Sequence, residues 1–243
     1  MNQPSDNFNR QASEYDKQAH IQKKAAQWAA TFLEVDLQGK TVHEFGAGTG
    51  FLTKHLIRTG ACVKATDRAE SMIRIGSQKQ PEARWQSMDA WNPPFFPQVD
   101  RIYSASLLQW APQPLKTLRK WKEKIKKGGS CLHAIYIEGT LSELIKCLPC
   151  SPPITFKSDQ DWEALFRDAG YSQVRTSIKS KKYEFPSPLA LLRSLHKIGV
   201  NGPTMLGFTQ TKRLLARYRS DYSLNNGKVS STWTTCIVEA SVD

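Results

Sequence analysis

The chain lacks any stretch that resembles a membrane span or a secretion signal. None of its 243 residues lies in a run approaching the roughly 20 apolar residues that cross a bilayer, and the polar first segment, residues 1–7, has no apolar signal core. Internal repeats and low-complexity tracts are also missing. These absences predict a cytoplasmic protein without a membrane partner.

Cysteine is scarce, and its spacing provides no metal site. Of the five cysteines, Cys147 and Cys150 form a lone C-x-x-C pair with no second pair and no nearby histidine, whereas structural zinc needs four ligands. Cys62, Cys131 and Cys236 fall inside predicted strands, where we expect buried thiols. The chain is therefore predicted to keep its cysteines reduced and to bind no metal.

Acidic residues are fewer than basic residues in this chain. The chain has 34 Lys and Arg against 22 Asp and Glu, which gives a net charge of +12 and an isoelectric point of about 9.5. This excess suits an acidic partner (nucleic acid, anionic membrane or acidic protein) about as well as it suits a solvated basic surface. A hydrophobic content of 40% and this length predict one globular α/β domain with insertions or a lid.

Alternating strand and helix patterns predict a doubly wound, mostly parallel α/β sheet of Rossmann-like type. A helical arm comes first, at residues 13–32, as a lid over a cofactor or as a packing helix. Strands are expected at residues 41–45, 61–66, 83–87, 99–104 and 130–137, and helices at 51–58, 69–77 and 114–126. Parallel strands joined in this way have right-handed crossovers.

The second half of the chain departs from this alternation. After a short helix and a proline-rich turn, a helix capped by Ser158 or Asp159 leads to strands at 171–179 and 231–240, which complete a seven-stranded sheet. Helices at 187–198 and 209–219 separate these last two strands. We divide the single domain into a lid arm (1–38), a cofactor-binding half (39–138) and a substrate-side half (139–243) whose helical insertion, about 186–220, encloses substrate.

A glycine-rich turn follows the first strand and reads Glu44-x-Gly46-x-Gly48-x-Gly50. Dinucleotide sites use G-x-G-x-x-G, which places a pyrophosphate on the next helix. The third position of that pattern is Phe51 here, which is too bulky for close helix–strand packing. An acid two residues before the first glycine instead suits a cofactor with a cationic amine, and the E/D-x-G-x-G-x-G signature resembles motif I of the class I methyltransferases.

Three further segments fall where an S-adenosylmethionine site needs them. Asp67 ends the second strand, 21 residues after Gly46, where it can accept both ribose hydroxyls or instead cap the next helix. Residues 89–90 follow the third strand on the adenine side, and residues 104–110 follow the fourth on the methionine side. The predicted cofactor-binding residues are Glu44, Gly46, Ala47, Gly48, Gly50, Asp67, Arg68, Met72, Asp89, Ala90, Ser104 and Gln109.

One motif points to a different chemistry. Asn92-Pro93-Pro94-Phe95 matches the N-P-P-F/Y of amino-group methyltransferases. In those enzymes the motif follows the fourth strand, whereas here it precedes that strand. We interpret it as a loop.

Three segments resemble the malonyl-acyl-carrier-protein O-methyltransferases of biotin synthesis. Residues 8–22 are similar to the family's F-x-R-A-A-x-x-Y-D…A-x-x-Q arm, residues 104–110 to its S-N-x-A-L-Q-W segment, and residues 191–200 to its L-R-S-L-K-x-I-G-A segment. The likeness runs from about residue 8 to residue 237. The chain departs from the family pattern at three positions: Ala47 for a common Cys, Ala105 for the usual Asn, and Trp233 for a frequent Tyr.

The resemblance implies methyl transfer from S-adenosylmethionine to the free carboxylate of a malonyl thioester on acyl carrier protein, which primes pimeloyl synthesis for biotin and leaves S-adenosylhomocysteine. A carboxylate is already ionised at neutral pH, so the reaction needs no general base, and the chain has no obvious catalytic dyad. Tyr15 is expected to close over the methyl donor. Arg193 is expected to orient the malonyl carboxylate or to contact the carrier's prosthetic phosphate.

The same resemblance gives the basic charge a partner, because acyl carrier proteins are acidic. The residues expected to form a docking face are Lys116, Arg119, Lys120, Arg193, Lys197, Lys212 and Arg213. We expect a monomer and no nucleic-acid partner, since no RNA-binding appendage accompanies the domain. The alternatives are a methyltransferase of a quinone or another carboxylic acid, an RNA methyltransferase, and a non-catalytic S-adenosylmethionine-binding module.

Overall fold

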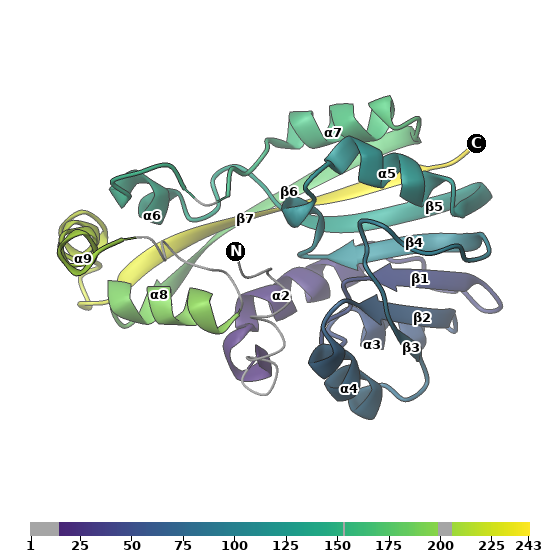
Figure 1. The fold of residues 1–243 in the computed structure, drawn as a ribbon, viewed down its shortest axis with the longest axis horizontal. Coiled ribbons are helices and arrows are strands. Elements are labelled where there is room, and N and C mark those ends of the chain that lie inside the picture. The colour runs from purple at the N-terminus through teal and green to yellow at the C-terminus, as the bar shows by residue number, and fades with distance from the viewer. Residues whose placement is uncertain (1–14, 153, 199–205) are drawn as a thin grey trace.

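A seven-stranded sheet forms the centre of the molecule, with strand order β3-β2-β1-β4-β5-β7-β6 (Figure 1). The structure is a computed structural model and describes residues 15–152, 154–198 and 206–243. The strands are β1 (Thr41–Phe45), β2 (Cys62–Asp67), β3 (Arg84–Ser87), β4 (Val99–Ala105), β5 (Ile125–Tyr136), β6 (Ser172–Phe185) and β7 (Val229–Ser241). The first five pair in parallel, and β7 runs antiparallel to β5 and β6. This mostly parallel sheet confirms the predicted Rossmann-like fold class.

Helices connect the strands, and a helical arm precedes β1 as predicted. Residues 15–18 form a first helical turn. The helices that follow are α2 (His20–Ala29), α3 (Thr53–Arg58), α4 (Glu70–Lys79), α5 (Pro114–Lys122), α6 (Ser142–Cys147), α7 (Asp159–Asp168), α8 (Pro188–Lys197) and α9 (Phe208–Tyr222), with the 3-10 turns η1 (Ala30–Phe32) and η2 (Leu108–Trp110). Ser158 caps α7 through a capping box, as the sequence predicts.

Apolar layers cover both faces of the sheet. On one face α5 and α7 bury Trp121 and Trp162 in a cluster that includes Phe45 of β1. On the other face α2 and α3 bury residues such as Ala26 and Leu56. Because both faces are covered, β1 is buried at four consecutive positions instead of alternating. This packing fixes the carboxyl ends of the parallel strands, where open α/β sheets bind their ligands.

A third apolar cluster lies beyond the ends of β5 and β7. Helices α6, α8 and α9 contribute Leu144, Leu191 and Leu214, which pack with Tyr136 of β5 and Trp233 of β7. Helices α8 and α9 are the predicted pair between the last two strands. They add a wall beside the carboxyl end of the sheet (Figure 1).

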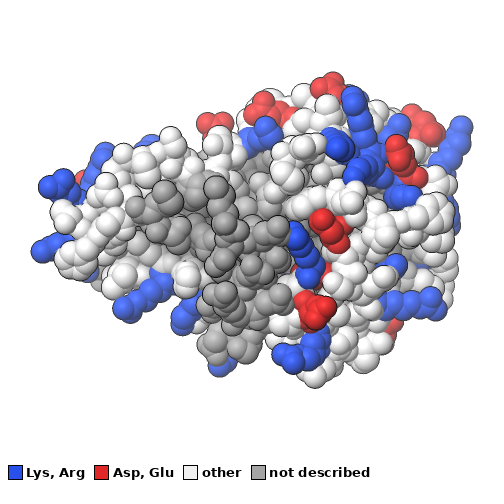
Figure 2. All heavy atoms as spheres, viewed as in Figure 1, with Lys and Arg blue, Asp and Glu red and all other residues white. Residues whose placement is uncertain are grey.

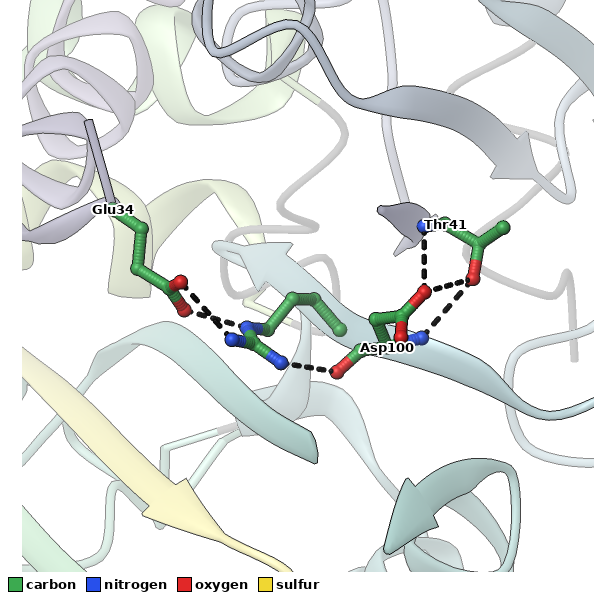
Figure 3. Close-up of polar contacts among 4 residues, drawn as sticks. Glu34, Thr41 and Asp100 are labelled. Carbon is green, nitrogen blue, oxygen red and sulfur yellow. Dashed lines mark hydrogen bonds and ion pairs between the residues drawn. The ribbon is translucent and has the colours of Figure 1, made fainter. Parts of the chain in front are cut away.

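A polar network fastens the start of β1 to the start of β4 (Figure 3). The Asp100 carboxylate accepts hydrogen bonds from the Thr41 backbone N–H (2.8 Å) and hydroxyl (2.7 Å). Arg101 donates to both carboxylate oxygens of Glu34, at 2.6 and 3.0 Å. Desolvation raises the pKa of Asp100, but the hydrogen bonds from Thr41 and the contact with Lys126 together outweigh it and hold this pKa well below its usual range. The network therefore ties the segment that follows α2 to the central strands.

Two predictions about elements are wrong. The helix expected to run to residue 126 ends at Lys122, and Ile125 is instead the first residue of β5, paired with Val99. Cys62, expected to be buried, is exposed. It is the first residue of β2, and β3 pairs only from Lys64 onward, so Cys62 extends past the neighbouring strand. Cys131 and Cys236 are buried free thiols, as predicted.

Strand β6 is longer than predicted. Pairing with β7 continues from Arg175 to Phe185, six residues beyond the expected end at Lys179.

Within the described ranges, no helix is long and apolar enough to cross a membrane. The His, Cys, Asp and Glu side chains of those ranges form no group of three or more that could hold a metal ion.

Candidate active site

The glycine turn between β1 and α3 forms the floor of the site. Gly46 has a φ of +65°, a backbone conformation that favours glycine. A Cβ at this position would lie 2.8 Å from both methyl carbons of Leu107, so the turn after β1 closely approaches the turn after β4. Glycine is therefore required for the backbone to line a cavity between these two turns.

Glu44 lies beneath this turn and is almost completely buried, at 1% exposure. Its Oε2 accepts a hydrogen bond from the Thr53 hydroxyl at 2.6 Å. Burial raises the pKa of Glu44 to about 8; the Thr53 hydrogen bond opposes this shift and the nearby Asp67 adds to it. A cationic ligand beside Glu44 would favour its ionised form.

Asp67, at the end of β2, organises the backbone around the cavity. Its Oδ2 accepts the Gly48 N–H at 2.8 Å, and its Oδ1 accepts the Ala69 N–H at 2.9 Å. Burial raises the pKa of Asp67, and these backbone N–H groups oppose the shift. The Arg68 backbone N–H also bonds this carboxylate, so only part of its capacity to accept hydrogen bonds is left for a ligand hydroxyl. The diol-binding role of Asp67 stays a prediction.

A cavity of about 170 Å³ extends from Gly46 along the carboxyl ends of the strands. Seven of the predicted cofactor residues line it: Gly46, Gly48, Asp67, Arg68, Met72, Asp89 and Ala90. Met88, Trp91, Leu107 and Trp110 add apolar walls. Two carboxylates beside apolar walls suit a ligand with a ribose, a flat base and a cationic end, which are the parts of S-adenosylmethionine.

The remaining predicted residues lie elsewhere. Glu44 and Ala47 line an adjoining recess of about 30 Å³, and Gln109 lines a third cavity. Gly50 lines none of these cavities. Its φ of +90° is a backbone conformation that favours glycine, so it shapes the turn itself. Ser104 is completely buried within β4 and lies 2.8 Å from Nδ1 of the buried His133. Ser106, two residues further on with a φ of +60°, is the serine that lines the cavity.

The amino-terminal arm lies against the glycine turn. The Tyr15 ring stacks on Phe51 with centroids 5.9 Å apart and packs against Met72. Asp16 accepts the Thr49 hydroxyl at 2.5 Å and forms an ion pair with Lys79. Burial, with a smaller contribution from Asp67, raises the pKa of the Tyr15 hydroxyl. The arm thus places a protonated phenol at the cavity, as expected for a lid, while residues 1–14 of the predicted arm lie outside the described residues.

A third cavity, of about 40 Å³, opens on the substrate side of the sheet. Tyr15 and Ser106 line all three cavities, which therefore meet at these two residues. The other residues that line the third cavity are Gln22, Gln109, Trp110, Tyr136, Leu141, Ile154, Phe156, Ile198 and Trp233. A reaction between two ligands, one on each side, is expected where the cavities join.

Sequence reasoning did not assign Tyr136 to the site, and it included Ser106 only within the segment 104–110, from which it chose Ser104 and Gln109. Tyr136 is the last residue of β5, so its position at the carboxyl end of a parallel strand was the available signal. Gln22 and Trp233 were noted in the sequence only because they lie in segments that resemble the family's motifs. They meet Tyr136 because α2 crosses β5 and β7 pairs with it, contacts that are long-range in the sequence.

Arg193 lines none of these three cavities. It is exposed on α8, whose following residue Ile198 reaches the third cavity. The seven residues expected to form one docking face do not gather on one. Lys116, Arg119 and Lys120 lie on α5, well separated in Figure 1 from α8 and α9, which carry the other four.

A larger cavity, of about 300 Å³, lies at the other end of the sheet. It is lined by the amino ends of β4 and β5 and by polar residues such as Arg101, Arg175 and Glu239. It exceeds the cavity beside the glycine turn in volume, and a shallow surface cavity beside α5 is larger still, at about 450 Å³, so size does not identify the ligand site. The glycine turn, Glu44 and Asp67 all lie at the carboxyl ends, so we assign the site there.

Comparison with known proteins agrees with this assignment. A family profile described as "Methyltransferase domain" matches residues 43–133, which include the glycine turn and Asp67. The YcgJ protein of Bacillus subtilis superimposes with a TM-score of 0.66 over 90% of this chain and 99% of that one, at 15% identity. A phosphoethanolamine N-methyltransferase of Haemonchus contortus, solved in complex with S-adenosyl-L-methionine, gives a TM-score of 0.56 over 94% of this chain and 52% of that one, at 16% identity. The protein is a class I S-adenosylmethionine-dependent methyltransferase.

Among curated proteins, the chain is similar to malonyl-[acyl-carrier protein] O-methyltransferases. The one from Priestia megaterium is 26% identical over 247 residues, with 90% of each chain covered. The biotin biosynthesis bifunctional protein BioHC of Cellvibrio japonicus is 32% identical over 139 residues, which cover 56% of this chain and 28% of that protein.

Proposed function

We propose that the protein methylates the free carboxylate of a malonyl thioester carried by acyl carrier protein, giving the malonyl methyl ester that primes pimeloyl synthesis for biotin. The observation that carries this proposal is the absence of a general base among the described residues that line the third cavity. Burial raises the pKa values of Tyr15 and Tyr136, so both phenols stay protonated at neutral pH. An amine or hydroxyl acceptor would need a base, whereas a carboxylate is ionised already.

The bound cofactor would supply a methyl group on a positively charged sulfur. Asp67 would hold its ribose, Glu44 would face its cationic end, and Met72 and Ala90 would pack against its base. Tyr15 closes the junction of the cavities and, with Ser106, sets where the acceptor can approach. Excluding water from the acceptor anion and aligning it with the methyl group are the contributions we assign to the protein.

Arg193 is proposed to contact the carrier's prosthetic phosphate. Of its two predicted roles, orienting the malonyl carboxylate is poorly supported, because Arg193 lines no part of the third cavity. Arg193 precedes Ile198 by five residues, so their backbone positions are about 7.5 Å apart along the helix axis. That position suits an anion held outside the cavity.

The carrier is proposed to dock on α8 and α9 as an acidic partner. Arg193, Lys197, Lys212 and Arg213 form no ion pair within the described part of the chain. Figure 2 shows Lys and Arg side chains around this end of the molecule with little acidic surface between them. The positive field would speed encounter with an acidic carrier and orient it beside Ile198.

The test is a parallel incubation with methyl-labelled S-adenosylmethionine. Malonyl-acyl carrier protein, acetyl-acyl carrier protein, malonyl-coenzyme A, free malonate and RNA would be supplied separately. We expect label on the malonyl carrier and none on the acetyl carrier, which lacks the free carboxylate. Label only on free malonate or another small acid would favour a small-molecule methyltransferase, and label only on RNA would refute the proposal.

A further inference from the structure

Four buried polar atoms without a hydrogen-bond partner belong to residues that line the third cavity. They are Gln22 Oε1, Gln109 Oε1, Tyr136 OH and Trp233 Nε1. Such atoms number ten among the described residues, so this one small cavity accounts for four of them. Buried polar atoms are normally paired, and unpaired ones destabilise the folded protein. Their concentration here therefore indicates that ordered water or a polar ligand group pairs with them.

The chemistry of these atoms defines the ligand. Trp233 Nε1 can only donate a hydrogen bond. Burial keeps the Tyr136 phenol protonated; the Ser106 hydroxyl is close enough to oppose this rise in pKa in part, but it lies outside hydrogen-bond geometry and leaves the phenol free to donate to a ligand. The two rings meet edge to face with centroids 5.0 Å apart, so their polar groups serve one small region. Each glutamine amide can present either its oxygen or its NH2 group. A group with several acceptor oxygens pairs with the two ring donors, and with both glutamines when their amides present NH2 to the cavity.

The lack of charged side chains in the lining of the cavity and the volume of the cavity further restrict the kind of ligand group that fits. No Lys, Arg, His, Asp or Glu occurs among the described residues that line the cavity. Its volume of about 40 Å³ is greater than the roughly 10–15 Å³ that one enclosed water molecule requires, so it has room for one carboxylate-sized group. Neutral donors hold such a group without the strong charge pairing by which an arginine would reduce its nucleophilicity.

We propose that Trp233 and Tyr136 donate the hydrogen bonds that hold the acceptor's carboxylate, and that Gln22 and Gln109 complete this carboxylate cradle. The assignment rests on the proposed function, whose acceptor group it places. It also gives a role to Trp233, which stands where the related family often has Tyr. Both residue types supply one donor at the end of a large ring, so the substitution preserves the contact.

The test is a binding measurement on protein saturated with S-adenosylhomocysteine, which permits no turnover. Malonyl-pantetheine and acetyl-pantetheine would be titrated calorimetrically into wild type, Trp233→Phe and Tyr136→Phe. We expect each variant to bind malonyl-pantetheine about tenfold more weakly, since each loses one hydrogen bond to a charged group. Acetyl-pantetheine, which lacks the carboxylate, should bind wild type and variants equally weakly.

Trp162→Phe is the matched control. Trp162 Nε1 is also buried without a partner, but it lies on α7 in the core away from the cavity. This control should leave the affinity for malonyl-pantetheine unchanged. Tyr136→Phe should also leave the melting temperature of the ligand-free protein unchanged or higher, because it removes an unpaired buried hydroxyl; a purely structural Tyr136 would lower it.

Unchanged malonyl-pantetheine affinity in both cavity variants would overturn the cradle, as would equal affinity of wild type for the two probes or no saturable binding of the malonyl probe. The proposed function fails separately, if malonyl-acyl carrier protein is not methylated. Selective binding without methylation would leave the cradle standing and refute the reaction.

Discussion

Glu44 is an ionisable residue whose charged form is disfavoured by its burial in the folded protein. A carboxylate with 1% exposure and one hydroxyl partner is poorly solvated, which is why its pKa rises to about 8. The usual value is 4.5, so between pH 4.5 and 8 the folded state binds this proton more tightly than the unfolded state does. Stability from this residue is therefore fully present below about pH 4.5 and is lost as pH rises through 8.

The expected consequence concerns Glu44→Gln in the ligand-free protein. The variant cannot ionise, so its melting temperature should exceed that of wild type at pH 8.5 by about 5 °C and match it closely at pH 4.5. Differential scanning calorimetry at both pH values measures the difference. Parallel pH profiles for the two proteins would show that Glu44 is not the group responsible. The same variant should bind cofactor more weakly, since it lacks the charge that faces the cationic end.

The site residues differ in how far the sequence could place them. Asp67 and Gly46 follow from the strand–turn–helix pattern, because each lies at a fixed point of a local motif. Ser104 and Ser106 could not be separated in this way. Their roles depend on strand alternation and on the positive φ of Ser106, and neither is visible in composition or spacing.

Among the elements, the arm ahead of α2 makes the contacts that a closing lid requires. Asp16 bonds Thr49 in the glycine turn and Lys79 at the end of α4, while Tyr15 rests on Phe51. Side-chain contacts to residues about one-third exposed are individually weak. The arm is therefore expected to open more readily than the sheet beneath it.

We expect Asp16→Ala to loosen the arm without unfolding the domain. S-adenosylhomocysteine affinity should fall by roughly three- to tenfold, because about 1 kcal/mol of arm contacts is lost, and amide exchange should quicken at residues 15–19. Calorimetric titration and hydrogen-exchange mass spectrometry measure the two effects. Glu163→Ala, which removes the exposed ion pair with Arg167 on α7, is the control and should change neither. Equal losses in both variants would argue against a lid.

The end of α5 shows why the sequence pattern alone does not define the boundary between a helix and a strand. Leu118, Trp121 and Ile125 recur at helical spacing, so the pattern continues smoothly to residue 126. Ile125 is indeed buried, but in β5, where it pairs with Val99. A short apolar segment fits a helix or a strand equally well, and the pairing partner decides between them.

At the scale of the whole molecule, the parallel sheet was predictable because its strands alternate with amphipathic helices and end at recognisable turns. The charge distribution was not predictable. The sequence predicts one docking face of seven basic residues, whereas α5 lies apart from α8 and α9 in the folded chain. The third cavity also escaped the sequence, because α2, β5, η2 and β7 meet there only through tertiary packing.

The separation of these helices makes carrier docking testable. Reversing Arg193 and Lys197 to Glu should raise the KM for malonyl-acyl carrier protein about tenfold and weaken its dependence on ionic strength, without changing cofactor affinity. The matched reversal of Lys116 and Arg119 on α5 should change the KM little. Steady-state kinetics at two salt concentrations measures both. An equal or larger effect from the α5 pair would place docking elsewhere.

The central claim is that the acceptor atom is a carboxylate oxygen, and the chemical lability of the product tests it most directly. After incubation of malonyl-acyl carrier protein with methyl-labelled S-adenosylmethionine, the labelled product would be treated with mild base and the volatile methanol collected. A methyl ester releases its label as methanol, and we predict that nearly all of the transferred label is released. Label that stays bound through this treatment, as an N-methyl or C-methyl group would, contradicts the account.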